Sequence, residues 1–384
     1  MRFAVDAHAI GRHLTGNEVY VRSLLNGFAG LDQDSEFIAY LSMEDAESWV
    51  PARFPVRHIS VNPFVRLGCD FALKLRRDRP GLLHVQYTAP LSCPVPVVVS
   101  VHDVSFIEHP DYFPFYRSLQ LRMTVRRTIQ KATRILTGSE FSRDAIARAY
   151  NLDPARIAVV PNAAADCYHP VRREAALAQV RERFGLAAPF LLAVGDLQPR
   201  KNHKGLIEAF TSLIRSHPNL PHRLALAGKE TWFAGRVHGA ARESGLTDRI
   251  HFLGFVSDDD LLHLYNACEL FCFPSYYEGF GLPVLEAMAC GAPVCCSNTS
   301  AVPEVADGAA LLFNPYNTAE IARAMLDLVL LPELNVRMRR LGLHRATQFS
   351  WRKTAQETLE VYNSVVEQRE LAGRAAATAP ISLR

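Results

Sequence analysis

The chain has 384 residues, of which 49% are hydrophobic and 21% are charged, a composition typical of a soluble globular protein. This length exceeds what one hydrophobic core usually serves, so we expect two domains. The formal net charge of +3 is too small to predict nucleic-acid binding by itself. No stretch approaches the roughly 18 consecutive apolar residues of a membrane helix, and the first residues lack the apolar segment of a signal peptide, which predicts a cytoplasmic protein.

Eight cysteines are present, and none stands in a C-x-x-C pair or near a histidine at zinc-finger spacing. This usage fits a reducing compartment. Five of the eight lie in apolar stretches, where a free cysteine behaves as a small buried hydrophobic residue. These five are Cys268, Cys272, Cys290, Cys295 and Cys296.

Strand-like runs alternate with helix-like segments along the chain, which is the signature of parallel βαβ units. The first series of runs covers residues 2–7, 36–42, 57–61, 82–87, 96–103, 134–139 and 157–162. The second series covers residues 190–195, 222–228, 249–254, 270–274, 292–298 and 309–314. We therefore predict an α/β protein in which two Rossmann-like, doubly wound domains face each other across a cleft, with ligands at the carboxyl ends of the strands.

The segment "DCYHPVRRE" separates the two series and carries Pro170 and a cluster of charges, which is typical of a domain boundary. The residues after the second series have the periodicity of helices, and the last residues resemble a flexible tail. We expect an N-terminal domain over 1–165, a linker over 166–185, a C-terminal domain over 186–350, a C-terminal helix over 351–368 and a flexible tail over 369–384.

Residues 112–134, "YFPFYRSLQLRMTVRRTIQKATR", form a basic segment that begins with aromatic side chains and holds no acidic residue. A basic helix with an aromatic end is typical of a helix that lies in the membrane interface. The pattern also fits a helix that turns its apolar residues to the domain core and its arginines to solvent. Those apolar residues are Leu119, Met123, Val125 and Ile129. Both interpretations remain open at this point.

The segment "FLLAVGDLQPRKNHKGLIEAF" joins a strand that ends at Gly195 to a loop with two adjacent cations, Arg200 and Lys201. Asn202 then provides an N-cap for the helix that follows. Adjacent basic residues in a loop are often only solvated. Their position after the carboxyl end of a strand instead favours contact with a bound anion.

A glycine-rich turn in "YYEGFGLPVLEAM" separates a strand from a short helix. Gly279 and Gly281 permit close approach of the backbone, and Pro283 suits the first helical position. The backbone N–H groups near Phe280, Gly281 and Leu282 then lie at the helix N-terminus, where the macrodipole favours an anion such as a phosphate.

Two glutamates flank this turn, Glu278 just before the helix and Glu286 one turn into it. A carboxylate accepts two hydrogen bonds at once from vicinal hydroxyls, so one acid suits a ribose diol and the other a second sugar. A phosphate site between two sites for sugar diols matches the chemical groups of a nucleotide sugar. The alternative is that Glu286 only complements the helix dipole and Glu278 is a loop acid.

On these segments the chain resembles the retaining glycosyltransferases of the GT-B fold in family 4 (glycosyl transferases group 1), and among them mannosyltransferases. The hallmark of that family is a glutamate, seven residues and a second glutamate, which "EGFGLPVLE" supplies. The resemblance runs from about residue 2 to 366 and is most specific in the second half. Further segments resemble the family's other blocks: "VSVHDVSFIEHP", "VGDLQPRKN", "LGFVSDDDLLHLYNACELFCFPS" and "FSWRKTAQETLEVY".

The resemblance implies a donor site in the C-terminal domain. Arg200 and Lys201 would neutralise the donor diphosphate, and Glu286 would bind the ribose. Glu278 would hold the donor sugar beside the backbone amides of residues 279–282. Arg200, Lys201 and Glu278 are thus implied as catalytic residues.

The resemblance also implies contacts outside that cluster. The backbone near Phe255 and Val256 would meet the nucleotide base. His102, at a strand end in "VSVHD", matches the family's histidine near the reacting sugar carbon and is thereby implied as a further catalytic residue, whereas a lone histidine is equally often a core residue. Gly16 would contact the donor.

The chain departs from the family pattern in three places. Its first loop has one glycine near the helix start, Gly16, where many relatives have two, and Thr15 and Glu18 form a capping-box pattern there. Asp196 stands where some relatives place an arginine, and "PNAAADCYHP" lacks the usual glycine after Asn162. These departures concern individual contacts and leave the predicted fold unchanged.

Asp258, Asp259 and Asp260 in "VSDDDLLHLY" have the composition of a metal-binding acidic motif. Ser257 is a suitable N-cap, however, and the three acids then occupy the first helical turn, where the dipole favours negative charge. With two cations and a helix N-terminus available for the phosphates, we predict an enzyme that needs no metal and no other cofactor.

We expect the chain to transfer a sugar with retention from a nucleotide-sugar donor, by preference GDP-mannose, to a hydroxyl of a glycan or lipid-linked glycan in surface-polysaccharide biosynthesis. The alternatives are a transferase that uses a UDP-sugar and an epimerase or hydrolase of nucleotide sugars. A non-catalytic scaffold would lack the two cations or the glutamate pair, and all four are present. No basic stripe with interleaved aromatic residues predicts a nucleic-acid partner. Because many relatives elongate lipid-linked sugars, the resemblance favours peripheral contact of residues 112–134 with the inner face of the cell membrane.

Overall fold

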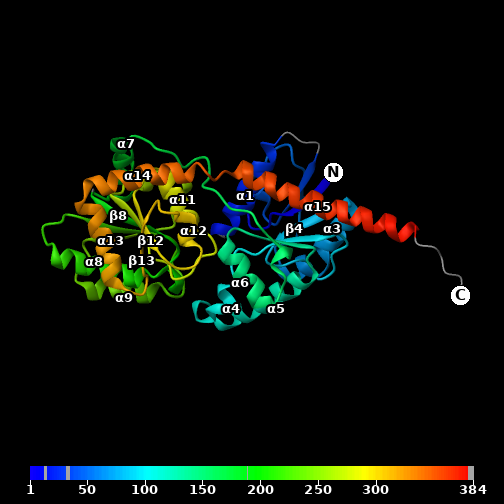
Figure 1. Cartoon of the computed structure of the whole chain (residues 1–384), viewed down its shortest axis with the longest axis horizontal. Coiled ribbons are helices and arrows are strands. Elements are labelled where there is room, and N and C mark those ends of the chain that lie inside the picture. Colours follow the sequence, from blue (N-terminus) through cyan, green and yellow to red (C-terminus); the bar gives the residue numbers. More distant parts are fainter. Residues whose placement is uncertain (13–14, 32–34, 188, 379–384) are drawn as a thin grey trace. The chain divides into compact units, whose positions relative to one another are not determined.

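The computed structural model of the chain describes residues 1–12, 15–31, 35–187 and 189–378, with side chains except at 15 and 372–378 (Figure 1). The chain forms two compact units. The N-terminal unit comprises Met1–Gly138, Arg143–Asn162 and the residues from Trp351 onward. The C-terminal unit comprises Ser139–Ser142 and Ala163–Ser350.

The N-terminal unit is built on a seven-stranded parallel sheet with the order β3-β2-β1-β4-β5-β6-β7. Each strand overlaps one of the runs expected from the sequence, and β3 begins one residue before its run, at Val56, so the prediction of these seven strands is confirmed. The strands are β1 (Arg2–Asp6), β2 (Glu36–Leu41), β3 (Val56–His58), β4 (Leu82–Gln86), β5 (Val97–Ser100), β6 (Arg134–Thr137) and β7 (Ile157–Val159).

Most of the α-helices of this unit lie between its strands in the chain, and the last one returns to it after the C-terminal unit. These helices are α1 (Thr15–Ala29), α2 (Pro63–Val65), α3 (Phe71–Asp78), α4 (Ser105–Glu108), α5 (Phe115–Lys131), α6 (Glu140–Tyr150) and α15 (Trp351–Thr378). The last helix packs on α1 (Figure 1). Gly27 permits that packing, because a Cβ atom at this position would lie 2.6 Å from the carbonyl oxygen of Trp351.

Helix α5 presents two kinds of apolar residue. Val125 and Ile129 are fully buried in the core beside the sheet. Leu119 and Met123 are exposed, and so are the aromatic rings of Phe115 and Tyr116. The core-facing interpretation of this helix is therefore confirmed for Val125 and Ile129 and wrong for Leu119 and Met123.

The C-terminal unit holds a six-stranded parallel sheet with the order β10-β9-β8-β11-β12-β13. All six strands lie within the expected runs. They are β8 (Phe190–Val194), β9 (Arg223–Ala227), β10 (Ile250–Gly254), β11 (Leu270–Phe273), β12 (Val294–Ser297) and β13 (Leu311–Phe313). The order reverses between β8 and β11, so the helices that follow these two strands pack on opposite faces of the sheet, and open α/β sheets bind ligands at such a point.

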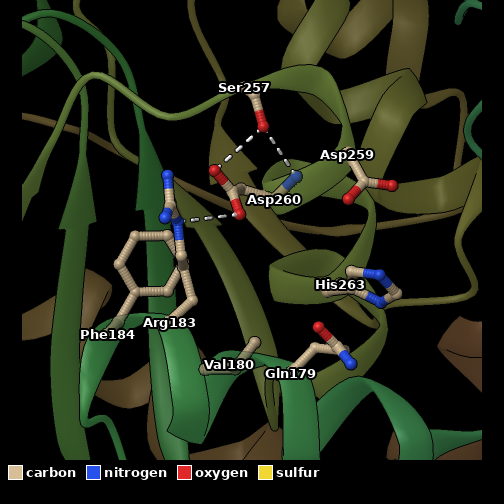
Figure 2. A pocket seen from close by; sticks show the side chains of 8 residues that line it. All are labelled: Gln179, Val180, Arg183, Phe184, Ser257, Asp259, Asp260 and His263. Atoms are coloured by element: carbon tan, nitrogen blue, oxygen red, sulfur yellow. Dashed lines mark hydrogen bonds and ion pairs between the residues drawn. The ribbon is translucent and has the colours of Figure 1, made fainter.

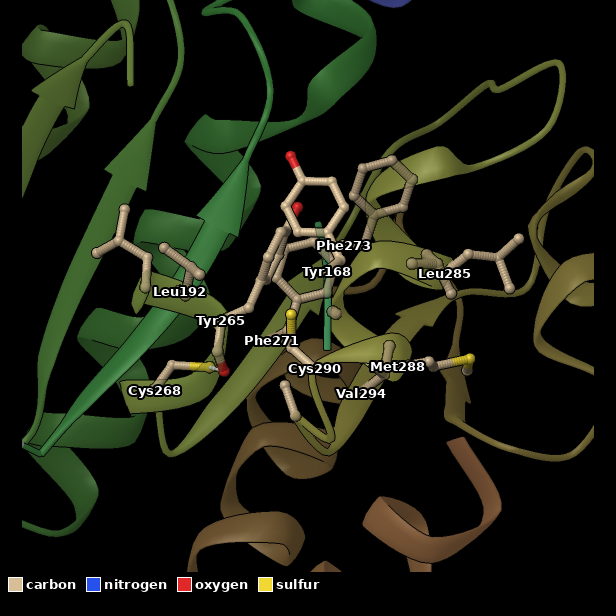
Figure 3. Close-up of a cluster of buried hydrophobic side chains, with 14 of the residues drawn as sticks. Tyr168, Leu192, Tyr265, Cys268, Phe271, Phe273, Leu285, Met288, Cys290 and Val294 are labelled. Atoms are coloured by element: carbon tan, nitrogen blue, oxygen red, sulfur yellow. Dashed lines mark hydrogen bonds between the residues drawn. The ribbon is translucent and has the colours of Figure 1, made fainter. Parts of the chain in front are cut away.

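Helices cover both faces of this sheet and enclose one hydrophobic cluster on each face (Figure 1). They are α7 (Arg173–Phe184), α8 (His203–Ser216), α9 (Ala234–Ser244), α10 (Asp258–Ala267), α11 (Leu282–Ala289), α12 (Val302–Ala306), α13 (Thr318–Leu330) and α14 (Pro332–Ala346). Strand β11 shows why both faces are apolar. Phe271 and Phe273 enter one cluster (Figure 3), while Leu270 and Cys272 enter the other, because successive side chains alternate.

The five cysteines expected to be buried are all buried and unpaired, which confirms their interpretation as small apolar residues. Two segments differ from the expected domain limits. Helix α7 lies inside the segment expected to be a linker and buries Ala176 and Val180 in the C-terminal unit. Helix α15 continues to Thr378, beyond the expected end at residue 368, because the alanine-rich sequence there has high helix propensity. Within the described part of the chain, no helix combines the length and apolar character that crossing a bilayer requires.

Candidate active site

The loops after β8 and β11 bring the two expected cations to one of the two expected carboxylates. Arg200 and Lys201 end a short 3-10 turn, Pro199–Lys201, and Asn202 then caps α8 with its side chain, as expected. Glu278 lies in the loop between β11 and α11. The two loops are far apart in sequence and meet because β8 and β11 are neighbours in the sheet.

Glu278 is held by both cations at once. The Lys201 Nζ atom lies 2.7 Å from Oε1, and the Arg200 Nη1 atom lies 2.8 Å from Oε2. Burial by itself raises the pKa of Glu278, but the two cations outweigh burial and hold this pKa at about 2. Glu278 is therefore ionised at every pH at which the protein is expected to work.

Lys201 lies beneath this cluster with only 11% of its side chain exposed. Its Nζ atom lies 5.0 Å from the ring centroid of Phe273, and its methylene chain runs along Gly195, where a Cβ atom would lie 3.0 Å from Lys201 Cδ. Burial lowers the pKa of Lys201, Glu278 opposes this shift, and the neighbouring Arg200 adds to it. Asp196 also raises this pKa, and together with Glu278 it does not cancel the effect of burial.

The glycine-rich turn leads into α11 as expected. Gly281 has φ of 117°, a conformation that favours glycine, and stands at the N-cap of the helix. The helix begins at Leu282, so Pro283 occupies its second position, one later than expected but still in the first turn, where its missing N–H costs no hydrogen bond. Phe280, between the two glycines, is buried.

Two serines that the sequence analysis did not identify hold the same turn. The hydroxyls of Ser139 and Ser142 donate to the carbonyl oxygen of Gly279, at 2.7 and 2.9 Å. Both serines belong to the C-terminal unit. Nothing in the sequence marks them, because they follow a strand of the first series and are distant from Gly279 along the chain.

Glu286 has a different environment from Glu278. It is buried on α11, and the Tyr265 hydroxyl of α10 donates to its Oε2 atom at 2.9 Å. Burial is the largest influence and raises the pKa of Glu286 to about 7; Asp258 raises it further, while Tyr265 and Lys201 lower it. The two carboxyl groups of the motif thus differ widely in pKa, which suits them to different chemical roles.

The loop after β10 exposes Phe255 and buries Val256. The Lys229 Nζ atom lies 5.0 Å from the ring centroid of Phe255. These residues lie at the same carboxyl edge of the sheet as Arg200 and Lys201, because the strands are parallel.

The acidic run after this loop forms the first turn of a helix whose N-cap is Ser257. Ser257 accepts a hydrogen bond from the backbone N–H of Asp260 at 3.1 Å, and the three acids form the first turn of α10, which confirms the expected N-cap. Figure 2 shows Asp260 between Ser257 and Arg183, beside a cavity of about 300 Å³ lined by α7 and α10. Across the described residues, no group of three or more histidine, cysteine, aspartate or glutamate side chains has the arrangement of a metal site.

His102 follows β5 in the N-terminal unit and is hydrogen-bonded to an uncharged amide, while burial lowers its pKa and the adjacent Asp103 opposes that shift. Its Nε2 atom lies 2.9 Å from Gln86 Oε1, and its ring meets that of Tyr20 at a centroid distance of 4.6 Å. An amide oxygen only accepts, so Nε2 carries the proton. Burial lowers the pKa of His102 to about 4, which leaves the imidazole uncharged near neutral pH.

Gly16 is exposed at the start of α1 in the N-terminal unit. A Cβ atom there would meet nothing within 4 Å, so packing does not require a glycine at this position. Glu18 accepts a hydrogen bond from the backbone N–H of Gly11 at 3.1 Å. The other half of the expected capping box, the Thr15 side chain, lies outside the part that the structure describes.

Two family profiles match the chain. Residues 179–345 match the family described as glycosyl transferases group 1, and residues 14–164 match the family described as glycosyltransferase family 4.

Curated relatives with similar sequences include two proteins of Escherichia coli. The O-antigen chain mannosyltransferase B is 34% identical over 266 residues, which is 69% of each chain. The serotype-specific mannosyltransferase WbdA is 34% identical over 193 residues, which is half of this chain and 24% of that protein. This chain therefore aligns with only about a quarter of WbdA.

Solved structures with the same fold include sucrose-phosphate synthase from Thermosynechococcus elongatus, with a TM-score of 0.78, 19% identity and coverage of 96% of this chain and 100% of that one. HepE from Anabaena, in complex with UDP and glucose, gives a TM-score of 0.74 at 20% identity, covering 94% and 99%. WaaG, a glycosyltransferase involved in lipopolysaccharide biosynthesis, gives 0.73 at 16% identity, covering 94% and 99%.

Proposed function

Because this chain belongs to the family 4 glycosyltransferases (glycosyl transferases group 1) and is thus a hexosyltransferase of the GT-B fold, we propose that it transfers mannose from GDP-mannose to a hydroxyl of a glycan or lipid-linked glycan. The similarity to an O-antigen chain mannosyltransferase over 69% of both chains supports this choice of sugar and a role in surface-polysaccharide biosynthesis.

The convergence of Arg200 and Lys201 on Glu278 is the observation that carries the proposed chemistry. Two cations and one ionised carboxylate leave one positive charge in a buried cluster. That charge, together with the N-terminus of α11, favours a diphosphate that becomes more negative as its bond to the sugar breaks. We assign both cations to the donor diphosphate.

The other assignments follow the family motif residue by residue. Glu278 would hold the donor sugar beside the backbone amides of 279–282, and Glu286 would accept hydrogen bonds from the ribose. The backbone at residues 255–256 would meet the base. His102 and Gly16 would contribute donor contacts from the N-terminal unit, with His102 acting as a neutral hydrogen-bonding group.

The proposed reaction retains the anomeric configuration and uses no metal. The bond between the sugar carbon and the diphosphate oxygen breaks, the acceptor oxygen bonds to that carbon from the same face, and the acceptor proton passes to the departing phosphate oxygen. No side chain is required as the general base in this scheme. The cations stabilise the departing charge, which is usually the largest contribution to such catalysis.

A donor screen tests the proposal. The full chain is incubated with GDP-mannose, UDP-glucose and UDP-galactose, with and without oligomannose acceptors, and products are identified by mass spectrometry and by the NMR coupling constants of the new glycosidic bond. We expect an α-linked mannosyl product that forms only with acceptor. Transfer from a UDP-sugar alone would favour the alternative donor class, which the UDP-bound HepE structure makes a specific candidate. Free sugar or an epimer formed at the same rate without acceptor would favour a hydrolase or epimerase.

A second proposal concerns the membrane surface. Helix α5 exposes Phe115, Tyr116, Leu119 and Met123 while burying its opposite apolar stripe. Arginines at 117, 122 and 126 are exposed around this patch, and residues 112–134 hold no acid. Exposed aromatic and apolar side chains with surrounding cations complement an anionic bilayer, where each cation is worth about 1 kcal/mol. We infer that α5 contacts an anionic membrane peripherally.

Liposome co-sedimentation tests this contact. The protein should sediment with anionic vesicles at low salt and be released near ~0.5 M salt, because exposed charges are screened. The variant to use is Arg122→Glu with Arg126→Glu, since Arg127 donates to the backbone carbonyls of Ala89 and Pro90 and is structural.

The matched control reverses two exposed arginines of α14, Arg337→Glu with Arg340→Glu. We expect the α5 variant to lose most of its binding and the α14 variant to keep it. Equal binding by both variants would exclude α5 as the contact.

A further inference from the structure

A hydroxyl from the interior of the C-terminal unit reaches one of the motif carboxyls. Tyr265 lies on α10 and is completely buried, in the cluster drawn in Figure 3. Its ring meets Phe271 edge to face, at a centroid distance of 5.4 Å, and also meets Tyr168 at 5.8 Å. The hydroxyl donates to Oε2 of Glu286 at 2.9 Å.

This hydrogen bond distinguishes the two oxygens of Glu286. It engages only Oε2, and the carboxyl group is buried on a helix that is itself packed into the core. A buried hydroxyl on a rigid aromatic ring has few alternative positions, so it constrains the orientation of the carboxyl plane. This hydrogen bond leaves Oε1 as the oxygen for a ligand, if a ligand binds this carboxyl.

We propose that Tyr265 is a positioning residue of the donor site, whose hydroxyl holds Glu286 in the charged form and in the orientation that binds the ribose. The inference rests on the proposed function, since it takes Glu286 as the ribose ligand. Tyr265 contacts neither ribose nor phosphate in this scheme and acts through the carboxyl group.

The charged groups around Glu286 explain why such a hydrogen bond is needed. Burial raises the pKa of Glu286, and Asp258 at the start of α10 raises it further, to about 7. Lys201, which is already paired with Glu278, and the Tyr265 hydroxyl lower it. Burial raises the pKa values of Tyr168 and of Cys290, the C-cap of α11, and Glu286 raises both further. Without the hydroxyl, a larger fraction of Glu286 would be protonated near neutral pH, and a protonated carboxyl is a poorer acceptor for ribose hydroxyls.

The first test measures nucleotide affinity as a function of pH. GDP and UDP are titrated separately into the full chain by calorimetry at pH 6, 7, 8 and 9. For the wild type we expect the affinity to rise by about tenfold between pH 6 and pH 8 as Glu286 loses its proton. In Tyr265→Phe the midpoint of this rise should move to higher pH, with affinity lowered by about fivefold at pH 7 and largely restored at pH 9.

Two controls accompany this test. Tyr168→Phe is the matched variant, because its hydroxyl lies in the same aromatic cluster but donates to Asp258, at 3.4 Å. It should keep the wild-type midpoint. Glu286→Gln should bind weakly and show only the pH dependence of the nucleotide's own phosphate. A uniform loss of affinity in Tyr265→Phe, with an unchanged midpoint, would show a merely structural role and overturn the proposal.

A second measurement needs no donor and so separates this inference from the proposed function. Since the pKa of Glu286 is raised on folding, the folded protein keeps a proton that the unfolded chain releases, and the stability owed to this group falls as pH rises toward 7. Urea unfolding should show that Tyr265→Phe loses more stability at pH 8 than at pH 5, because the lost hydrogen bond favours the charged form. A loss of equal size at both pH values would overturn the inference. Failure of GDP and UDP to bind the wild type would instead overturn the proposed function while leaving this result interpretable.

Discussion

The candidate residues of the two units differ in charge. In the C-terminal unit, Arg200, Lys201 and Glu278 form a buried cluster of ion pairs at 2.7 and 2.8 Å. In the N-terminal unit, His102 is uncharged and hydrogen-bonded to an amide, Gln86. Under the proposed function, stabilisation of developing charge would belong to the C-terminal unit, and His102 would act as a neutral hydrogen-bonding group.

A buried network of uncharged side chains lies near His102 in the N-terminal unit. The hydroxyl of Ser100 lies 2.8 Å from that of Tyr20 and 2.7 Å from His84 Nε2, and Tyr362 of α15 meets the other nitrogen of His84. Burial lowers the pKa of His84 to about 3, so this network carries no charge near neutral pH. Buried polar networks of this kind hold side chains in one arrangement and resist substitution.

The largest expected effect comes from the charged cluster. Lys201→Ala should lower kcat by about 100-fold or more while changing the donor KM less, because the ammonium acts most on charge that develops as the bond breaks. Steady-state kinetics with GDP-mannose measures both constants. Lys204→Ala is the matched control, since Lys204 is exposed and forms an ion pair with Glu208 at 3.7 Å, and its kcat should stay within about twofold. If Lys201→Ala keeps the wild-type kcat, the assignment of Lys201 to the donor diphosphate is wrong.

The pH dependence of kcat/KM should separate the two units. With its pKa near 7, Glu286 should produce a rise of about tenfold from pH 6 to pH 8 as it becomes the carboxylate. His102 has a pKa of about 4 and should contribute no change in that range. The rise should therefore persist in His102→Gln, at a lower overall rate, and disappear in Glu286→Gln. If the rise disappears in His102→Gln instead, the neutral character of His102 is wrong.

A smaller effect concerns the acidic turn of the C-terminal unit. Ser257→Ala removes the side-chain acceptor for the Asp260 N–H and should lower the free energy of unfolding by about 1 kcal/mol. Ser212→Ala in the exposed face of α8 is the matched control and should change it by less than about 0.5 kcal/mol. Chemical denaturation measures both. Equal stabilities for the two variants would contradict the capping role.

The smallest expected effect is that of metal removal. EDTA should leave turnover within about twofold of control, because cations and backbone amides are proposed to meet the phosphates without an ion. The measurement is initial rate with and without chelator, followed by addition of Mn²⁺. An absolute requirement for Mn²⁺ would contradict the metal-independent scheme and transfer part of the charge stabilisation to an ion, for which Asp258, Asp259 and Asp260 would be the first ligands to test.

Much of this molecule could be read from local patterns. Strand runs and their alternation with helices predicted both parallel sheets, because strands buried on both faces are near-continuously apolar. Asn202 and Ser257 were predicted as N-caps from their types and positions alone, and both caps are present. The C-terminal end of α15 could not be predicted in this way, because an alanine-rich terminal segment is compatible with either a helix or an irregular tail.

The sequence by itself determined the elements, the family and the residue types at the candidate site, since these depend on periodicity, capping and a motif with fixed spacing. Only the tertiary structure decided the partners of those residues. The adjacency of β8 and β11 placed Lys201 against Glu278, Ser139 and Ser142 reached Gly279 from elsewhere in the chain, and Tyr265 met Glu286. Burial and neighbouring charge then separated the two glutamates, one with a pKa of about 2 and the other of about 7, because a pKa depends on what surrounds a carboxyl in space and not on its place in a motif.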